Sequence, residues 1–320
     1  MKSGSWIQER INDPACDIVI IPGGEYEIEA PIVVPFAKQG TPDNPPRTVE
    51  LVGCGVSQTI IRPSERFPIG QPLLRIERSY TKVADLQLHG RRGDDSWHDV
   101  VGIDLPGGPS DLDALRRVII DNVVVRDTRH GMLIGRSGVT ILLAVIDCQF
   151  SVSTLQILKV HKGTTLRFVR TSFKEFGIGC ELFNAHGCSF ESCHWEGNRG
   201  TNPSLMLRGC SATSVRGAWF EESHRPSDNS SPWFAWVDGC IATLMNGTFV
   251  RKNPKLRVAL VGPTAHSEGT VIEGVCRVVG PWDHDAPVWS MRGSTPWIAP
   301  SCALVVDDVG GVHPALVKTL

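Results

Sequence analysis

Residues 145–197 read VIDCQFSVSTLQILKVHKGTTLRFVRTSFKEFGIGCELFNAHGCSFESCHWEG and repeat one short phrase three times. The copies are VIDCQF, FVRTSF and FESCHW, each an apolar residue followed five positions later by an aromatic one. The phrase recurs on both sides, giving the pairs Ile120/Val125, Val145/Phe150, Phe168/Phe173, Phe190/Trp195, Val215/Phe220 and Leu244/Phe249, with a weaker copy at Val83/Leu88. Successive starts from Ile120 onward lie 25, 23, 22, 25 and 29 residues apart. Such a period is typical of a solenoid, in which one turn cannot bury its apolar face alone.

A second strand-like run lies between the phrases and indicates which type of solenoid the chain forms. Its copies include VGIDLP, GMLIGR, GCELFN and SLMLRG, bounded by Gly, Asn, Asp or Ser. Alternation places Ile103, Leu105, Met132, Ile134, Cys180, Leu182, Leu205 and Leu207 on one face, and Asp104, Leu133, Glu181 and Met206 on the other. Several short strands per coil predict an all-β fold, a single-stranded right-handed parallel β-helix whose inward side chains stack in ladders.

The start of the chain resembles the pectate-lyase-like β-helix superfamily. It reads WIQERIN from Trp6, IIPGGEYEIEAPIVVP from Ile20 and VELVGCGVSQTIIRP from Val49, which is similar to the capping helix, P-x-G-x-Y strand entry and Gly-rich turn of that superfamily. The resemblance covers roughly residues 6–280 and implies a carbohydrate-directed protein, since polysaccharide lyases, glycoside hydrolases, uronate epimerases and phage tailspikes share the fold. The NTD, DD, GHG and RIK motifs of polygalacturonases and the DPHE-type motif of mannuronan epimerases are absent.

We therefore expect one domain over residues 1–320. A capping helix is predicted over 6–19, coils over 20–280, and an irregular C-terminal cap or intersubunit segment over 281–320. A cap is needed because the end of a solenoid exposes unpaired strand edges and apolar rungs. The resemblance to tailspikes implies that a homotrimer is one assembly open to the chain.

Composition narrows the partners. The net charge of −2 gives no global electrostatic case for nucleic acid, and no apolar run reaches membrane-spanning length. The first residues lack the apolar core of a secretory signal, so we expect a cytoplasmic or virion-associated protein if the chain begins here. The ten cysteines lack the spacing of a disulfide framework and are expected to be mostly reduced and buried.

Insertions in regular coils mark the walls of a binding groove. Two of the three polar insertions, HGRRGDDSWHDVVG and GPWDHDAPVW, place a tryptophan beside Asp and His. Indole rings stack on the C–H faces of sugars, and carboxylates accept hydrogen bonds from their hydroxyls. Trp97 and Trp282 are therefore expected to bind substrate, and the alternative for each loop is a solvated surface loop.

The outward side of the second run supplies the charged groups. Glu181, Asp104 and Asp238 are the carboxylates, with Lys159, Arg208 and Arg136 as cations from nearby coils and Asn184 as a polar contact. Glu181 is the strongest candidate, because Lys159 and Arg208 are expected on either side of it. We expect Glu181, Asp104, Asp238, Lys159 and Arg208 to be catalytic and Arg136 and Asn184 to bind substrate, against the alternative of a surface charge ladder.

Histidines and cysteines give weaker signals. His130, His161, His186 and His194 fall within a few coils, but such residues more often hydrogen-bond a turn. Cys188, Cys193 and His194 do not have the spacing of a common zinc site, and Cys148 and Cys193 instead predict an inward ladder. No metal or other cofactor is predicted; calcium, which some lyases of the superfamily use, is left to experiment.

Two functions of different class remain. One is a polysaccharide lyase or glycoside hydrolase acting on an acidic polysaccharide, and an epimerase on the same scaffold is a weaker variant. The other is a glycan-binding or purely structural module, such as part of a phage tail. Enzyme activity is favoured over binding alone, but the support from fold analogy is associational.

Overall fold

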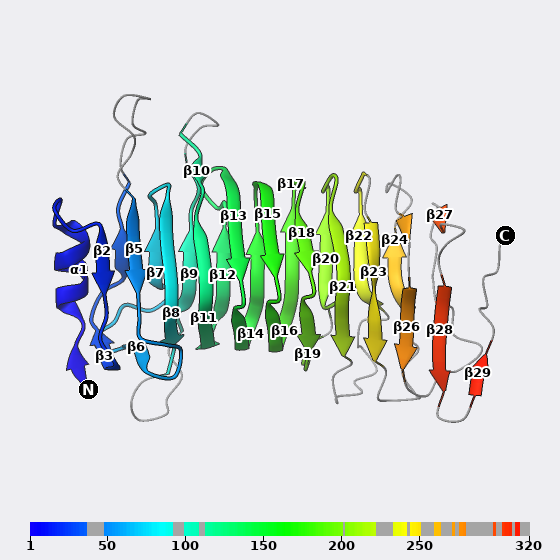
Figure 1. The fold of residues 1–320 in the computed structure, drawn as a ribbon, viewed down its shortest axis with the longest axis horizontal. Coiled ribbons are helices and arrows are strands. Elements are labelled where there is room, and N and C mark those ends of the chain that lie inside the picture. Colours follow the sequence, from blue (N-terminus) through cyan, green and yellow to red (C-terminus); the bar gives the residue numbers. More distant parts are fainter. Residues whose placement is uncertain are drawn as a thin grey trace.

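The computed structural model describes residues 1–36, 48–91, 99–108, 113–200, 202–221 and 233–241, and then the backbone of strands at 244–250, 259–263, 271–272, 275–279, 297–298, 303–308 and 311–313. Figure 1 shows the strands side by side along the long axis of the molecule, with α1 at the N-terminal end. Trp97 and Trp282 lie outside the described residues.

The chain is wound into a parallel β-helix with three faces. On the first face lie β2 (Ile18–Ile20), β5 (Val49–Val52), β10 (Leu115–Arg116), β13 (Thr140–Ile146), β15 (Gly163–Val169), β17 (Ala185–His186), β18 (Ser189–Glu191), β25 (Val271–Ile272), β27 (Trp297–Ile298) and the first halves of β8 (Thr81–His89), β11 (Ile119–Thr128), β21 (Ser214–Glu221) and β23 (Leu244–Val250). On the second face lie β1 (Lys2–Ser3), β3 (Gly24–Ile28), β6 (Thr59–Pro63), β19 (His194–Glu196), β26 (Val275–Val279), β28 (Ala303–Asp308), the second halves of β8, β11, β21 and β23, and the first halves of β14 (Gln149–Val160) and β16 (Ser172–Phe183).

The third face carries the second run of the sequence. It holds β4 (Ile32–Val34), β7 (Pro72–Ile76), β9 (Val101–Leu105), β12 (His130–Ile134), β20 (Leu205–Arg208), β22 (Trp233–Asp238), β24 (Ala259–Pro263) and the second halves of β14 and β16. Within the described residues, one pair of strands is antiparallel, where β29 (Gly311–His313) folds back on β28.

Stacking in register confirms the repeated phrase. Val145 pairs with Phe168 and Phe168 with Phe190 on the first face, and all three side chains are fully buried. On the second face, Phe150, Phe173, Trp195 and Phe220 form one column with ring centroids 5.7, 5.4 and 4.5 Å apart. The residues expected to point inward on the third face all belong to the hydrophobic core cluster, and Asp104, Leu133, Glu181 and Met206 do not, although each of these four is at most 8% exposed.

One rung departs from the expected phrase. Val215 pairs with Met245 rather than with Leu244, which lies opposite Ser214. Phe220 nevertheless pairs with Phe249, because the register shifts between Val215 and Ala218. An irregularity of one residue in β21 therefore absorbs the shorter spacing, which a fixed five-residue phrase does not predict.

Sharp turns at the corners between the faces explain why polar residues recur within the repeated sequence phrase. Asp85, Asn122, Asp147, Arg170, Ser192 and Gly217 each lie two residues after the inward residue of the first face, and all have a positive φ between 47° and 59°. A second column with positive φ lies three residues before the inward residue of the first face, at Tyr80, Arg117, Leu142, Thr165, Gly187 and Ala212. The left-handed conformation turns the chain sharply, and Gly, Asn and Asp adopt it at the lowest cost.

The N-terminal helix α1 (Ser5–Asn12) is shorter than the predicted 6–19. Asp13 has an extended conformation with ψ of 115°, as expected for a residue before proline, and β2 already begins at Ile18. Ile7 and Ile11 are buried against the first coil, and the side-chain amide of Gln8 accepts from Val33 N–H at 2.7 Å and donates to Val33 C=O at 2.9 Å. Gln8 thus satisfies the open edge of β4 as a neighbouring strand would.

At the other end, strand stacking continues beyond residue 280. β28 pairs in parallel with β26, from Val275 opposite Ala303 to Val279 opposite Asp307. The segment 281–320, expected to be irregular, therefore contributes a further strand to the second face. Among the described residues, no helix is long and apolar enough to cross a membrane.

Truncating a stacked aromatic should be costly. Phe168→Ala is expected to lower the free energy of unfolding by about 3–5 kcal/mol, because it leaves a cavity between Val145 and Phe190. Urea titration followed by circular dichroism measures this loss. Ile119→Ala is the control, since Ile119 is 39% exposed and the same truncation there should cost less than about 1 kcal/mol. Equal losses in both variants would contradict the assignment of Phe168 to a buried column.

Relieving backbone strain at a corner should instead increase the free energy of unfolding. Thr165 is β-branched, exposed and has φ of 56°, so Thr165→Gly should raise the free energy of unfolding by about 0.5–1 kcal/mol. The neighbouring Thr164→Gly is the matched control, because Thr164 lies within the same strand β15 without a positive φ, and glycine there should be destabilising. The same denaturation assay distinguishes the signs, and destabilisation by both substitutions would show that Thr165 is not strained.

Candidate functional site

The outward residues of the third face form one vertical row, called here the outer row. Register places in it, one coil after another, Arg75, Asp104, Leu133, Lys159, Glu181 and Met206. Neighbouring coils are about 4.8 Å apart, so residues distant in sequence become adjacent in the row. Three of the predicted catalytic residues, Asp104, Lys159 and Glu181, therefore lie on one face, as expected.

Asp104 is held by two arginines. Arg136 donates to both carboxylate oxygens, with Nε–Oδ1 at 3.2 Å and Nη2–Oδ2 at 2.8 Å, and Arg75 Nη1 lies 3.8 Å from Oδ2. The Asp104 side chain is fully buried, whereas Arg136 is 43% exposed. Asp104 is thus positioned to fix Arg136, whose guanidinium faces solvent.

Glu181 lies between two cations, as the sequence predicts. Lys159 Nζ is 3.6 Å from Glu181 Oε2, and Arg208 Nη1 is 3.9 Å from Oε1. Both cations also lie over the ring of Phe183, at 5.6 and 5.5 Å from its centroid. Glu181 is 8% exposed, so the two cations and the partly buried Phe183 ring are the more accessible parts of this cluster. Phe183 was not among the predicted site residues, although its place after Glu181 and Leu182 in GCELFN could have identified it.

Two histidines border the outer row. Burial lowers the pKa of His161, and the charges of Lys159 and Arg136 lower it further. Burial, followed by the charges of Arg129 and Lys159, lowers the pKa of His130 to about 4. Both imidazoles are therefore neutral near neutral pH, and the charge of Lys159 disfavours protonation of either one.

Other predicted residues lie further from Glu181. Asp238 pairs with Arg208, and Arg208 with Phe183, so Asp238 stands two coils beyond Phe183. Asn184 has φ of 47° and is followed in its column by Gly209 and Gly239, both at 60°. Asn184 therefore occupies a corner, which gives a structural reason for its presence in addition to any contact with substrate.

The carboxylates of the outer row are too far apart for glycoside hydrolysis by a pair. Asp104 and Glu181 are separated by three coil spacings, or about 14 Å along the row. Hydrolases place the two carboxyl groups about 5–9.5 Å apart. The row therefore offers one carboxylate among cations, rather than a pair of carboxylates.

The combination of Cys188, Cys193 and His194 does not form. Both cysteines are buried and point inward, with Cys193 Sγ donating to Phe168 C=O at 3.4 Å. Burial raises the pKa of Cys193 to about 12 and that of Cys188 to about 11, so both remain thiols. Cys148 and Cys193 lie in one inward column with Thr171 between them, and Thr171 Oγ1 likewise donates to a carbonyl of the preceding coil, Val145 C=O. The predicted cysteine ladder is confirmed, with threonine as its middle member.

His186 belongs to β17 on the first face and does not bond to a turn. Its Nδ1 lies 2.5 Å from Oγ of Ser211, its bridge partner on the next coil, so His186 links two coils along the first face.

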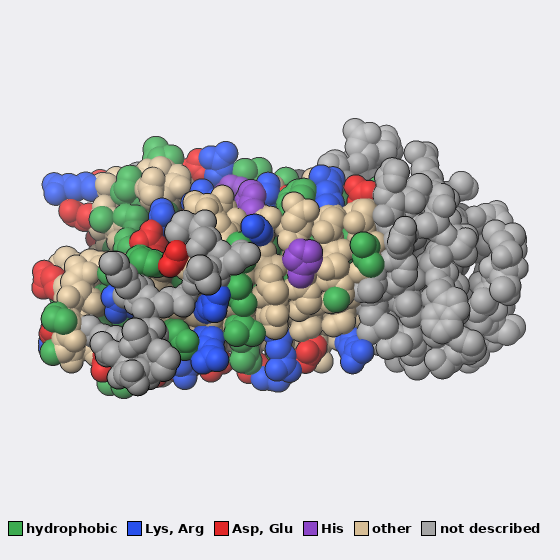
Figure 2. All heavy atoms as spheres, turned by 90° about the horizontal axis from the view of Figure 1, so that it is seen from above, with side chains coloured by type: hydrophobic (Ala, Val, Ile, Leu, Met, Phe, Trp, Pro, Cys, Tyr) green, Lys and Arg blue, Asp and Glu red, His purple; other side chains and the backbone are tan. Residues whose placement is uncertain are grey.

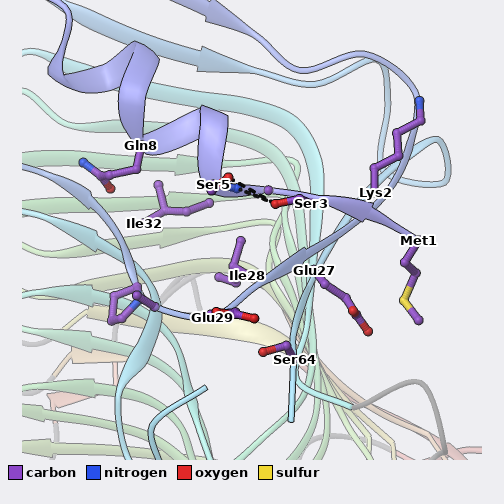
Figure 3. Close-up of a pocket in the computed structure, with 13 residues that line it drawn as sticks. Met1, Lys2, Ser3, Ser5, Gln8, Glu27, Ile28, Glu29, Ile32 and Ser64 are labelled. Atoms are coloured by element: carbon purple, nitrogen blue, oxygen red, sulfur yellow. Dashed lines mark hydrogen bonds between the residues drawn. The ribbon is translucent and has the colours of Figure 1, made fainter. Parts of the chain in front are cut away.

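A hollow of about 480 Å³ lies at the N-terminal end, away from the outer row. Figure 3 shows its lining, which includes Lys2, Gln8, Glu27, Glu29 and Ser64. None of the predicted site residues lines it. On the side of the molecule shown in Figure 2, basic and acidic side chains of the described residues are interspersed along the long edges, and no continuous basic stripe is visible.

The fold is shared with phage and bacterial proteins. Tailspike protein 2 from Escherichia coli O157:H7 bacteriophage CAB120 aligns with a TM-score of 0.60 and 11% identity over 94% of this chain and 40% of its own. The gp42 tailspike of Acinetobacter phage vb_AbaP_AS12 aligns with 0.54 and 9% over 94% and 60%. The A-module of mannuronan C-5 epimerase AlgE6 from Azotobacter vinelandii aligns with 0.50 and 14% over 94% and 95%.

These similarities show the fold. The chain spans only 40% and 60% of the two tailspikes, but almost the whole epimerase module. The sequence matches no protein-family model and no curated protein.

The partly buried His130 gives a pH prediction. Its pKa is about 4 in the folded chain against 6.5 as the ordinary value, so the unfolded state binds the proton first as the pH falls. The stability that follows is fully present above about pH 6.5 and is lost as the pH falls towards about 4. The urea midpoint of His130→Gln should therefore change less between about pH 7 and about pH 5 than that of the wild type. A His130→Gln variant with the wild-type pH dependence would contradict the burial effect.

Proposed function

We propose that the protein binds an acidic polysaccharide along the third face and cleaves it by elimination at Glu181. The observation that carries the proposal is the placement of Lys159 and Arg208 on either side of both Glu181 and Phe183. The fold supports it as well, because one protein that shares the fold is named for mannuronan, a polymer of uronate units.

Binding follows from the charges of the face. Arg136 and Arg208 are 43% and 45% exposed, whereas the carboxylates that they contact, Asp104 and Glu181, are 0% and 10% exposed, so this face offers its cations to a ligand. A uronate carboxylate can accept hydrogen bonds from Lys159 and Arg208, and the C–H face of its ring can pack on Phe183. Arg136, fixed by Asp104, would contact a further charged sugar along the third face.

The same contacts suit elimination. When a substrate carboxylate pairs with Lys159 and Arg208, one oxygen of Glu181 is released from these cations and can act as base. Glu181 then takes the proton from the carbon α to the carboxyl, and the cations stabilise the enolate that forms. The enolate electrons form the new C=C bond as the bond to the glycosidic oxygen breaks, and this oxygen leaves with a proton from solvent. No metal or other cofactor is required for these steps.

Other predicted residues have supporting roles in this proposal. Asp104 acts by positioning Arg136 and Arg75. Asp238, Asn184, Trp97 and Trp282 remain predicted contacts further along the groove. The single domain over 1–320 also remains a prediction, and the winding is inferred to be right-handed because crossovers between parallel strands are right-handed in nearly all sheets.

A second candidate function is supported by the tailspikes that share the fold. The chain corresponds to part of their length, as expected if it were one section of a longer assembly. In this alternative the third face binds a glycan without cleaving it, within a virion-associated homotrimer.

Glu181→Gln tests the proposal. The wild type should cleave a uronate-containing polysaccharide, measured by the ultraviolet absorbance of unsaturated products and by new reducing ends, with and without calcium. The variant should lose at least about 100-fold in turnover while retaining retardation in a gel containing that polysaccharide. Lys159→Ala and Arg208→Ala should weaken the retardation itself.

Glu191→Gln is the matched control, because Glu191 pairs with Arg167 on the first face and should leave turnover unchanged. If Glu181→Gln turned over as fast as the wild type, Glu181 would not be the base. Retardation of the glycan by a wild type that cleaves nothing in the panel would support the binding module instead.

A further inference from the structure

A second cluster of ionisable side chains lies on the second face, distinct from the outer row. Its members are His194 and Glu196 of β19 and Glu221 of β21, with Lys174 of β16 beside them. Lys174 belongs to the preceding coil and pairs with Glu196. On the following coil, Trp219 pairs with His194 and Phe220 with Trp195. The next residues along these two strands, Glu196 and Glu221, are therefore neighbours. Two carboxylates of like charge thus stand one coil apart, with the Lys174 ammonium beside Glu196 as a compensating charge.

The donor atoms of the three residues converge. His194 Nε2 lies 4.0 Å from Glu196 Oε2 and 3.9 Å from Glu221 Oε2, and all three donor atoms lie within 4.8 Å of one another. A tetrahedral ion with bonds of about 2.0 Å needs donors about 3.3 Å apart. Small side-chain rotations therefore bring these three groups to bonding distance without any change in the backbone.

Neighbouring groups already orient two of the ligands. Trp219 Nε1 donates to Glu221 Oε2 at 3.3 Å, and the His194 ring meets the Trp219 ring edge-on, with centroids 6.1 Å apart. Support of this kind fixes the direction of metal ligands in proteins. The Glu221 side chain is only 13% exposed, and those of His194 and Glu196 are 29% and 37% exposed, so the cluster is sheltered but reachable from solvent.

The donor set indicates the class of ion. Calcium and magnesium prefer oxygen ligands alone, whereas an imidazole nitrogen with two carboxylates suits zinc and other divalent first-row transition ions. Three protein ligands leave a coordination position for water or a ligand, as in catalytic rather than structural zinc sites.

We infer that His194, Glu196 and Glu221 form a binding site for a divalent transition ion of the zinc class. The site is independent of the cleavage proposed at Glu181, because it lies on a different face. The sequence pattern points to Cys188 and Cys193 as partners of His194, but the register of the coils brings it to Glu196 and Glu221 instead.

Lys174 is a competitor for the ion. Its Nζ lies 3.3 Å from Glu196 Oε2, and its side chain is 35% exposed, so the ammonium group can move aside. Its charge nevertheless opposes a second cation at the same carboxylate. Removing this charge should therefore tighten binding, which is an effect that simple loss of a surface ion pair would not produce.

Calorimetric titration of the full chain with zinc chloride tests the site. The wild type should bind one equivalent, His194→Gln and Glu221→Gln should each weaken it at least tenfold, and Lys174→Gln should strengthen it severalfold. Glu191→Gln should bind as the wild type does. Circular dichroism of each variant checks that the β-sheet signal is retained.

Cobalt(II) in place of zinc reports the ligands directly. Its near-ultraviolet spectrum should lack the charge-transfer band of a thiolate ligand, because the exposed Cys54 and the partly exposed Cys16 are not part of the site. A thiolate band, unchanged affinity in the His194 and Glu221 variants, or no zinc binding by the wild type would each overturn the inference. Equal binding of calcium and zinc would also overturn it, since imidazole ligation would then have no role.

Discussion

In-register stacking of successive coils is the constraint on which the rest of the structure depends. Every coil must place an apolar side chain above the one below it, as the column of Phe150, Phe173, Trp195 and Phe220 does. Each rung is stable only because its neighbours cover it, so the register is passed along the axis from coil to coil. At the N-terminal end no further coil covers the strand edge, and the Gln8 side chain takes its place by hydrogen bonding to both the N–H and the C=O of Val33.

Stacking also determines the chemistry of the surface. Outward residues separated by 22–29 positions in sequence become vertical neighbours, which brings Lys159 beside Glu181 and Glu196 beside Glu221. A cation next to a carboxylate is stabilising in such a ladder, whereas two adjacent carboxylates need a further charge. The two clusters therefore differ in kind: the first presents cations to an anionic ligand, and the second presents anions and an imidazole to a cation.

Much of the fold could be predicted from the sequence because the inward ladder repeats in type as well as in spacing. The spacing of the repeats alone predicts the two buried columns that contain Val145 and Phe150. It also predicts that Lys159 pairs with Glu181. The end of α1, the shifted register at Val215 and the strand β28 did not, because Pro14, a local irregularity and a degenerate final repeat interrupt the period. Side-chain direction was the other gap: the two arginines on Asp104 and the meeting of His194 with Glu221 depend on rotamers, which spacing does not specify.

Cross-linking between neighbouring coils tests the stacking most directly. Arg167 and Ser189 are in register on the first face, so their Cα atoms should be about 4.8 Å apart and cysteines at both positions should form a disulfide without reductant. Cysteines at Arg167 and Glu191 are offset by two residues, about 8 Å apart, and should not be linked. Peptide mass spectrometry identifies the bond: a link in the first pair alone is the predicted result, and no link there, or equal linking of both pairs, would contradict the register.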